Sequence, residues 1–250
     1  MIKRGKVIAS IEARYSATRL PGKVMLEING KPMLALMIER VKMAKSVEDI
    51  VIATSINPDN DVIEKLAKEL HIECYRGSED DVLDRVLKAA QMCKADHIIE
   101  LWGDSPLIDP NIIDSAVDHY FKHGYDCVGT CLDHTFPLGM SLLVFPTRIL
   151  NEVASTTNDP VDRENVSNYI YEHPEKYKTG NLPCPKELFR QDIRLTVDER
   201  NDFELIKNIF EHFQSKESSF GAKDVISYLD KNPDLLNINR NVKQKILRKT

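Results

Sequence analysis

One loop near the start of the chain concentrates residues that can bind phosphate. From Ala13 to Lys23 the sequence reads Ala-Arg-Tyr-Ser-Ala-Thr-Arg-Leu-Pro-Gly-Lys, which places Arg14, Ser16 and Arg19 within one short segment. Arginine forks hold two phosphate oxygens at once, whereas lysine supplies a mobile point charge. The loop matches neither a P-loop nor a dinucleotide fingerprint. It therefore predicts binding of a polyanion, most simply a nucleoside triphosphate.

The position of this loop favours phosphate binding over the alternative, a solvated basic loop. An apolar run, Val7–Ile11, comes directly before it and is typical of a short buried strand. Ligands of α/β proteins bind where such strands end. We therefore expect the cations of this loop to face a ligand.

Two aspartates follow other apolar segments and are candidates for a metal site. Asp104 comes after a strand-like run at 97–102, in a loop bounded by Gly and Pro, and Asp198 comes after a second run at 192–197. Carboxylates at the ends of neighbouring strands can hold Mg²⁺ against substrate phosphates. A helix cap is the alternative role for each, although Asp109 is better placed than Asp104 to cap the following helix.

The elements that must position these residues alternate between strand-like and helix-like patterns. Such alternation predicts an α/β fold in which a mostly parallel sheet is covered by helices on both faces. The expected strands are 6–11, 49–55, 72–75, 97–102 and 192–197, and the expected helices are 32–44, 62–70, 80–94, 164–172, 202–213 and 222–230. Residues 128–145 break the alternation and predict an antiparallel excursion, which is a candidate surface for a homodimer.

Composition excludes several classes of protein. The chain has 250 residues and a net charge of −5, which is unfavourable for general binding of nucleic acid. Its five cysteines are odd in number, which argues against a disulfide framework and favours a reducing compartment. Cys127 and Cys131 suit a metal pair less well than small apolar strand residues. With neither a signal segment nor a membrane-length apolar run, we expect a cytoplasmic protein with no membrane partner.

Several motifs occur together in a fixed order. The chain resembles the acylneuraminate/3-deoxy-manno-octulosonate cytidylyltransferase superfamily, and within it the spore coat polysaccharide biosynthesis protein SpsF-like group. The motifs that carry the resemblance are Arg14-x-Ser16-x-x-Arg19-Leu20-Pro21-Gly22-Lys23, Gly30-Lys31-Pro32-Met33-Leu34, Ala53-Thr54-Ser55, Gly103-Asp104-Ser105-Pro106-Leu107 and Leu195-Thr196-Val197-Asp198.

The resemblance implies a Rossmann-like nucleotide-diphospho-sugar transferase fold and transfer of CMP from CTP to an acceptor, with release of pyrophosphate. It implies a Mg²⁺ cofactor held by Asp104 and Asp198, and catalytic roles for Arg14, Lys23 and Asp104. The nucleotide-binding residues that it implies are Ala13, Arg14, Ser16, Arg19, Lys23, Ala53, Thr54, Ser78, Asp84, Arg85 and Gly103. A helix N-terminus capped by Ser78 is the alternative interpretation of the segment 77–85.

The acceptor side departs from the pattern of the resembling group. Residues 139–145 read Gly-Met-Ser-Leu-Leu-Val-Phe where that group commonly has Gly-Leu-Asp-x-Glu-Val-Phe, so that two carboxylates are missing, at Ser141 and Leu143. Arg163, Glu164 and Asn165 stand where Arg-Glu-His is usual, and we expect them to face the acceptor. Two interpretations of these changes stay open: an acceptor smaller or more anionic than the family norm, or drift in a hairpin that has no effect on the acceptor. The expected acceptor is a sugar acid, a sugar or a small phosphorylated or anionic compound.

The same resemblance suggests how the chain is divided. We expect a nucleotidyltransferase domain at 1–214, in which 128–197 forms the acceptor and dimerisation part, and a helical extension at 215–250 packed on it. Two other functions stay open at this point. One is guanylyl transfer to a sugar phosphate, and the other is a catalytically silent nucleotide-binding protein.

Overall fold

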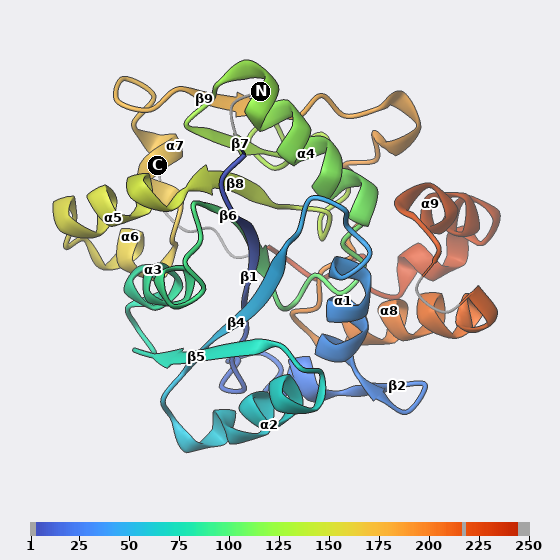
Figure 1. The fold of residues 1–250 in the computed structure, drawn as a ribbon. Helices are drawn as coiled ribbons and strands as arrows, with labels where there is room; N and C mark the ends of the chain where they lie inside the picture. The colour runs from blue at the N-terminus through green and yellow to red at the C-terminus, as the bar shows by residue number, and fades with distance from the viewer. Residues whose placement is uncertain (1–3, 217–218, 245–250) are drawn as a thin grey trace.

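A seven-stranded mixed sheet forms the centre of the molecule (Figure 1). The computed structural model describes residues 4–216 and 219–244. The strands run in the spatial order β5-β4-β1-β6-β8-β7-β9. Their bounds are β1 (Val7–Glu12), β4 (Asp49–Ser55), β5 (Glu73–Gly77), β6 (His97–Trp102), β7 (Cys127–Gly129), β8 (Leu143–Pro146) and β9 (Thr179–Asn181), and a small separate hairpin consists of β2 (Glu27–Ile28) and β3 (Lys31–Pro32).

The four strands that the N-terminal half contributes to this sheet, β1, β4, β5 and β6, are parallel, as the sequence predicts. Strand β1 pairs with β4 on one side and with β6 on the other, and β4 pairs with β5. Residues 7–11 of β1 are buried on both faces, which explains why this strand is apolar throughout rather than alternating. Because the strands are parallel, the phosphate-loop residues after β1 and Asp104 after β6 emerge at the same edge of the sheet.

The predicted antiparallel excursion is confirmed. Strand β8 runs antiparallel to both β6 and β7, and β9 joins β7 in parallel at the edge of the sheet. The excursion therefore extends the same sheet instead of forming a separate layer. Its use as a dimer surface stays a prediction.

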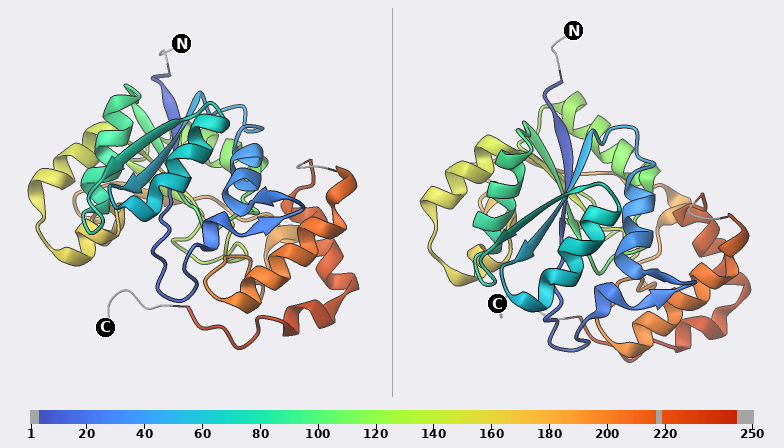
Figure 2. Two further views of the ribbon diagram at one scale, coloured as in Figure 1. Left: turned by 90° about the horizontal axis from the view of Figure 1, so that it is seen from below. Right: turned by 60° about the horizontal axis from the view of Figure 1, so that its bottom comes forward.

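Helices cover both faces of the sheet (Figures 1 and 2). Apolar residues of α1, α2 and α4 share one core with one face of the sheet, and those of α3, α5 and α7 share a second core with the other face. Helices α8 and α9 extend the first core and lie beside α1 in both views of Figure 2. The helices are α1 (Met33–Val41), α2 (Asp61–Glu69), α3 (Val82–Met92), α4 (Pro110–His123), α5 (Thr147–Thr156), α6 (Pro160–Glu164), α7 (Asn168–Glu172), α8 (Arg200–His212) and α9 (Ala222–Lys231).

The predicted strand at 192–197 is wrong. Its alternating apolar residues Ile193, Leu195 and Val197 are buried as expected, but the segment makes only an isolated bridge between Leu138 and Arg194. Its backbone is bonded instead to loops, since the Val197 amide donates to the carbonyl of Asp104 at 2.8 Å. Apolar residues at every second position are thus buried here in an extended segment outside the sheet.

The single helix predicted at 164–172 is also wrong, because α6 ends at Glu164 and α7 begins at Asn168. Asn165 has a non-helical backbone and its side-chain amide donates back to the carbonyl of Val161 at 2.8 Å. Asparagine competes with the helical backbone in this way, which explains the break.

The C-terminal part of the chain packs on the same core. Val225, Ile226 and Leu229 of α9 are buried there. Residues 217–218 and 245–250 of the predicted extension lie outside the described residues, and the division into a domain and an extension stays a prediction. Among the helices of the described segments, none combines the length and apolar character needed to cross a membrane.

Arg40 ties α1 to the segments that precede α4 and α9. Its buried guanidinium donates to the carbonyls of Ile108 at 3.0 Å, Leu107 at 3.3 Å and Phe220 at 2.9 Å. Burial lowers the pKa of Arg40 to about 10, and Asp109 opposes that change. The cation remains charged at neutral pH because of these partners.

We predict that Arg40→Lys destabilises the fold by about 2–3 kcal/mol, since one ammonium cannot satisfy three carbonyls in the geometry of a guanidinium fork. Urea unfolding followed by circular dichroism measures the change. The matched control is Arg148→Lys, whose exposed side chain contacts Asp126 at 3.3 Å. Equal stability of the two variants would contradict the role of Arg40.

Candidate active site

The ammonium of Lys23 holds together three segments that are far apart in the sequence. It lies 3.0 Å from Asp104 Oδ2 and 3.1 Å from Asp198 Oδ1, and it donates to the carbonyl of Val197 at 2.6 Å. The Lys23 side chain is only 12% exposed. The phosphate-loop lysine and the two predicted metal ligands therefore meet in one cluster, although Asp198 does not follow a strand.

The backbone of the phosphate loop is closed by a tight turn. The Gly22 amide donates to the carbonyl of Tyr15 at 2.7 Å, and Gly22 has a φ of +71°. A Cβ at this position would lie 2.8 Å from the ring of Tyr15, so only glycine fits. The buried side chain of Asn60 accepts a hydrogen bond from the Tyr15 amide at 2.9 Å and fixes the start of the loop.

Three cations surround the carboxylate of Asp198. Besides Lys23, Arg19 lies 2.9 Å and Arg194 2.6 Å from its Oδ2 atom. Burial on its own raises the pKa of Asp198, but these cations outweigh it and lower the pKa below its ordinary value. Asp198 is therefore ionised at neutral pH, as a metal ligand must be.

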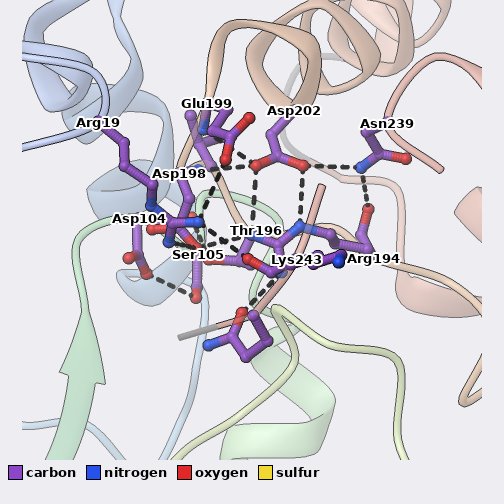
Figure 3. Close-up of polar contacts among 12 residues, drawn as sticks. Arg19, Asp104, Ser105, Arg194, Thr196, Asp198, Glu199, Asp202, Asn239 and Lys243 are labelled. Carbon is purple, nitrogen blue, oxygen red and sulfur yellow. Dashed lines mark hydrogen bonds and ion pairs between the residues drawn. The ribbon is translucent and has the colours of Figure 1, made fainter. Parts of the chain in front are cut away.

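A second layer of residues fixes the backbone on either side of Asp198 (Figure 3). Asp202 is fully buried and accepts hydrogen bonds from the amides of Asp198 at 2.9 Å and Glu199 at 3.1 Å. Arg194 donates to Asp202 at 2.9 Å, and Asn239 donates to the same carboxylate at 2.9 Å and to the carbonyl of Arg194 at 3.0 Å. Glu199 rather than Asp198 is the N-cap of α8, so the alternative role of Asp198 is wrong.

The segment after α9 reaches the same cluster. Arg19 donates to the carbonyl of Lys243 at 2.9 Å, and Arg194 donates to the side chain of Gln244 at 2.6 Å. Figure 3 shows Asn239 on the side of Arg194 opposite to Asp104. Residues close to the C-terminus thus contact the cations that surround Asp198.

Arg14 and Ser16 of the phosphate loop face a different carboxylate. Glu79 lies 3.1 Å from the Arg14 guanidinium, accepts from the Ser16 hydroxyl at 2.7 Å and from the Asn57 amide at 3.1 Å. Burial raises the pKa of Glu79, but Ser55, Ser16 and Arg14 together bring its pKa below the ordinary value. Glu79 is thus the counter-charge of Arg14.

The residues predicted to contact the nucleotide lie along this edge of the sheet. Ala53 and Thr54 lie near the carboxyl end of β4, which ends at Ser55, and Thr54 donates to Asn60 at 3.1 Å. Gly103 packs so closely against β1 that a Cβ would lie 2.9 Å from the carbonyl oxygen of Glu12. Ala13 is buried beside it.

The segment at 77–85 forms the start of α3, but Ser78 is not its cap. Asp81 is the N-cap and accepts from the Asp84 amide at 3.0 Å. Arg85 donates to the carbonyl of Ser78 at 2.6 Å, whereas Asp84 pairs with Lys88 on the surface of the helix at 2.7 Å.

The predicted acceptor residues lie next to α3 rather than around Lys23. Arg163 pairs with Asp81 and donates to the carbonyl of Ala154 at 2.9 Å. Glu164 is exposed, and Asn165 terminates α6. Arg163 therefore connects α6 to the start of α3, and its contact with an acceptor stays a prediction.

Three supporting residues were not predicted from the sequence: Asn60, Asp202 and Asn239. A signal for Asp202 is present, since Glu199-x-x-Asp202 has the spacing of a capping box. Asn60 belongs to a turn-forming Asn-Pro-Asp-Asn run, which indicates a turn without indicating its partner. Nothing local in the sequence indicates that Asn239 contacts Asp202.

The donors fit a hard divalent cation that also binds substrate phosphates. No group of three or more His, Cys, Asp or Glu side chains suited to a metal occurs within the described part of the chain. Asp104 and Asp198, which share one cation, supply two carboxylates. Mg²⁺ needs few protein ligands because water and phosphate oxygens complete its shell. The pair therefore suits a metal that arrives with the nucleotide.

A cytidylyltransferase family model matches residues 8–231. The chain belongs to the cytidylyltransferase family. It is 30% identical over 237 residues to the spore coat polysaccharide biosynthesis protein SpsF of Bacillus subtilis, covering 91% of this chain and 95% of that protein. The family consists of nucleotidyltransferases, so the chain is assigned to a class of enzymes and not to a class of binding scaffolds.

Solved structures agree with this assignment. A cytidylyltransferase structure from Leptospira borgpetersenii has a TM-score of 0.88 at 33% identity and covers 97% of this chain and 100% of that chain. A CMP-2-keto-3-deoxy-manno-octonic acid synthetase solved with CTP has a TM-score of 0.60 at 17% identity, which shows the shared fold, and covers 83% of this chain and 99% of that chain.

Shorter matches are to cytidylyltransferases that are named for a sugar-acid substrate. A 3-deoxy-manno-octulosonate cytidylyltransferase of Geobacter metallireducens is 35% identical over 114 residues, 45% of this chain and 43% of that protein. An 8-amino-3,8-dideoxy-manno-octulosonate cytidylyltransferase of Shewanella piezotolerans is 33% identical over 114 residues, 45% of this chain and 46% of that protein.

We predict that Asn239→Ala lowers the free energy of unfolding by about 1–3 kcal/mol, because the buried carboxylate of Asp202 and the carbonyl of Arg194 each lose a hydrogen bond. The loss of support under Asp198 should also weaken CTP binding measured with Mg²⁺. Urea unfolding and calorimetric titration give the two values.

Asn237→Ala is the matched control, since Asn237 is exposed on the same segment. If both variants keep the stability and CTP affinity of the unmodified protein, the contacts of Asn239 do not support Asp198.

Proposed function

We propose that this protein is a Mg²⁺-dependent cytidylyltransferase that transfers CMP from CTP to a small sugar-like or anionic acceptor and releases pyrophosphate. The observation that carries the proposal is the cluster in which Lys23 of the phosphate loop lies between Asp104 and Asp198. Relatives that use sugar acids support an acceptor of that class, and similarity to SpsF supports a role in surface polysaccharide synthesis.

The phosphate-loop cations are suited to exchange their present partners for a triphosphate. Arg14 pairs with Glu79, Arg19 pairs with Asp198 and Glu199, and Lys23 pairs with both aspartates. These contacts hold the cations ready and limit the entropy that is lost when phosphates bind. We propose that Arg14, Arg19 and Lys23 bind the triphosphate and stabilise the charge that develops on the departing pyrophosphate.

The reaction is an in-line substitution at the α-phosphorus. A bond forms between an acceptor oxygen and the α-phosphorus, and the bond from the α-phosphorus to the bridging oxygen breaks, so that pyrophosphate leaves with the electron pair. An acceptor hydroxyl must also lose its proton, whereas a phosphate or phosphonate acceptor is already ionised.

Asp104 and Asp198 would hold the Mg²⁺, which supplies charge neutralisation at the phosphates. Their carboxylates now share the ammonium of Lys23, so their charge is balanced in the free protein. Arg194 and the buried Asp202 keep Asp198 directed toward this position. The contribution of the protein is thus to hold two aspartate side chains and three cations at one edge of the sheet.

The nucleobase is proposed to lie near the segment between β5 and α3, where Ser78 and Arg85 are joined by a hydrogen bond. Membership of the cytidylyltransferase family favours cytosine over guanine. Guanylyl transfer to a sugar phosphate is thereby the weaker candidate.

We predict that Asp104→Asn lowers the rate of pyrophosphate release by about 10²–10³-fold, because the amide keeps the shape of the carboxylate but not its charge. The fold should be kept, as judged by circular dichroism. Asp133→Asn, in an exposed loop, is the control and should have the activity of the unmodified protein. Full activity of Asp104→Asn would contradict the proposed metal site.

We further predict that Arg163→Glu raises the acceptor KM several-fold and leaves the CTP dissociation constant nearly unchanged, since Arg163 is proposed to face the acceptor. Steady-state kinetics and calorimetry separate the two effects. Arg148→Glu, at an exposed arginine of α5, is the control. A parallel loss of CTP affinity and acceptor affinity would show that Arg163 supports the whole site and does not face the acceptor.

A further inference from the structure

A polar cluster interrupts the apolar face of the sheet that α3 covers. Ser10 and Glu12 of β1, Glu100 of β6 and Arg85 of α3 lie in this layer, where their neighbours belong to the second core. Ser10 is 0%, Glu100 1% and Arg85 2% exposed. Charged side chains are rarely buried to this extent unless they are fully paired.

The sheet register brings these side chains together. Ser10 lies opposite Glu100, and Glu12, two residues further along β1, lies on the same face. The preceding pair on this face, Ile8 and Ile98, is apolar and fully buried. The polarity therefore begins only toward the carboxyl ends of the strands, which is the edge that carries the candidate active site.

The two carboxyl groups are not fully paired within the described residues. Glu100 forms hydrogen bonds with Glu12 and Ser167. Glu12 Oε1, Glu100 Oε2 and the hydroxyl of Ser10 are nevertheless enclosed without a hydrogen-bond partner, and so is Arg85 Nε. Arg85 Nη1 donates to the carbonyls of Ser78 at 2.6 Å and Glu79 at 3.3 Å.

Enclosed polar atoms without partners cost stability, so a fold keeps them when another function requires them. Here three unpartnered oxygen atoms and one unpartnered nitrogen lie in the layer between the sheet and α3. An apolar side chain at either glutamate would continue the second core. The unpartnered oxygen atoms therefore suit the binding of a group that donates hydrogen bonds.

The charge of the cluster indicates which group that is. The cluster contains two carboxyl groups, Glu12 and Glu100, and one guanidinium, Arg85. If both carboxyl groups were ionised, one negative charge would have no counter-charge, so either a proton or another cation has to balance it. Burial raises the pKa of Glu100 to about 7 and raises that of Glu12, and Arg85 does not offset this increase. The other titratable groups that face the pair are Asp104, Cys127, Cys131 and Tyr171. A bound ammonium group would take the place of the proton and balance the charge.

The location connects this cluster to the transfer reaction. Glu12 directly precedes Ala13 and Arg14 of the phosphate loop, and its carbonyl accepts from the amide of Gly103 at 2.8 Å. Asp104 follows Gly103. The pair thus lies at the same strand ends as the proposed metal ligands, on the face of the sheet that α3 covers.

We propose that Glu12 and Glu100 bind a primary amino group of the acceptor and select amino-bearing acceptors over their hydroxyl counterparts. The proposal rests on the nucleotidyl transfer inferred above and names the chemical class of acceptor. Arg85 positions the pair by its charge. A hydroxyl group is the competing occupant, because it also donates a hydrogen bond but leaves the charge unbalanced.

The test compares Glu100→Gln with the unmodified protein and with Glu73→Gln, an exposed glutamate of β5. Melting temperatures are measured at pH 8 with the non-reactive α,β-methylene analogue of CTP and Mg²⁺. The two probes are 8-amino-3,8-dideoxy-manno-octulosonate and 3-deoxy-manno-octulosonate, which differ in an amine and a hydroxyl. Calorimetry with the CTP analogue alone is the reference for nucleotide binding.

We expect the amino probe to raise the melting temperature of the unmodified protein more than the hydroxyl probe does. This difference between the probes should disappear in Glu100→Gln and remain in Glu73→Gln. Without any probe, Glu100→Gln should melt about 2–4 °C higher than the unmodified protein at pH 8. The glutamate binds more protons when folded, so stability falls as pH rises from its unfolded pKa to about 7, and glutamine removes this loss.

Each contrary result overturns the proposal in a distinct way. Equal stabilisation by the two probes, or a preference that persists in Glu100→Gln, excludes an amino-selective pair. If Glu100→Gln melts below the unmodified protein at pH 8, Glu12 and Glu100 serve only the stability of the fold and the proposal is wrong. No shift with either probe, while the CTP analogue still binds, overturns the amine site but leaves nucleotidyl transfer intact. Absence of nucleotide binding to the unmodified protein overturns both.

Discussion

The contact of one ammonium with two carboxylates is the interaction on which the site depends. Asp104 and Asp198 are close enough to share Lys23, and two carboxylates at that separation repel each other unless a cation lies between them. Lys23 is largely buried, so each of these charges would be costly without the others. The phosphate loop, the end of β6 and the segment before α8 therefore have to fold together to hold the two carboxylates in place.

Residues with no proposed role in the reaction support this contact. Asp202 serves both as the first-turn acceptor of α8 and as the partner of Arg194, which in turn holds Asp198. Asn239 connects this pair to the segment after α9, which also reaches Arg19. The C-terminal residues thus stabilise a site whose first element is at the N-terminus. On the opposite face of the sheet the incompletely paired Glu12 and Glu100 approach the same edge, so the two faces meet at the site of the proposed transfer.

The parts of this architecture that depend on local pattern could be predicted from the sequence. The apolar run before Arg14 and the alternation of strand and helix gave the parallel half of the sheet, and ordered motifs gave the family and the cluster of Lys23, Asp104 and Asp198. The apolar residues at 193, 195 and 197 predicted a strand that does not exist, because an extended segment bonded to loops has the same apolar pattern as a strand in a sheet. Partners distant in sequence, such as Asn239 with Asp202 or Glu12 with Glu100, leave no local signal, since they depend on how whole elements pack.

Calorimetric titration of the purified protein with CTP, UTP, GTP and ATP, each with and without Mg²⁺, tests the central claim most directly. If the Lys23 cluster and its two arginines form a metal-assisted triphosphate site, CTP binds selectively and Mg²⁺ strengthens the binding. Absence of binding by every triphosphate to the folded protein would contradict the account, because the cations of the phosphate loop would then have no ligand of the kind proposed.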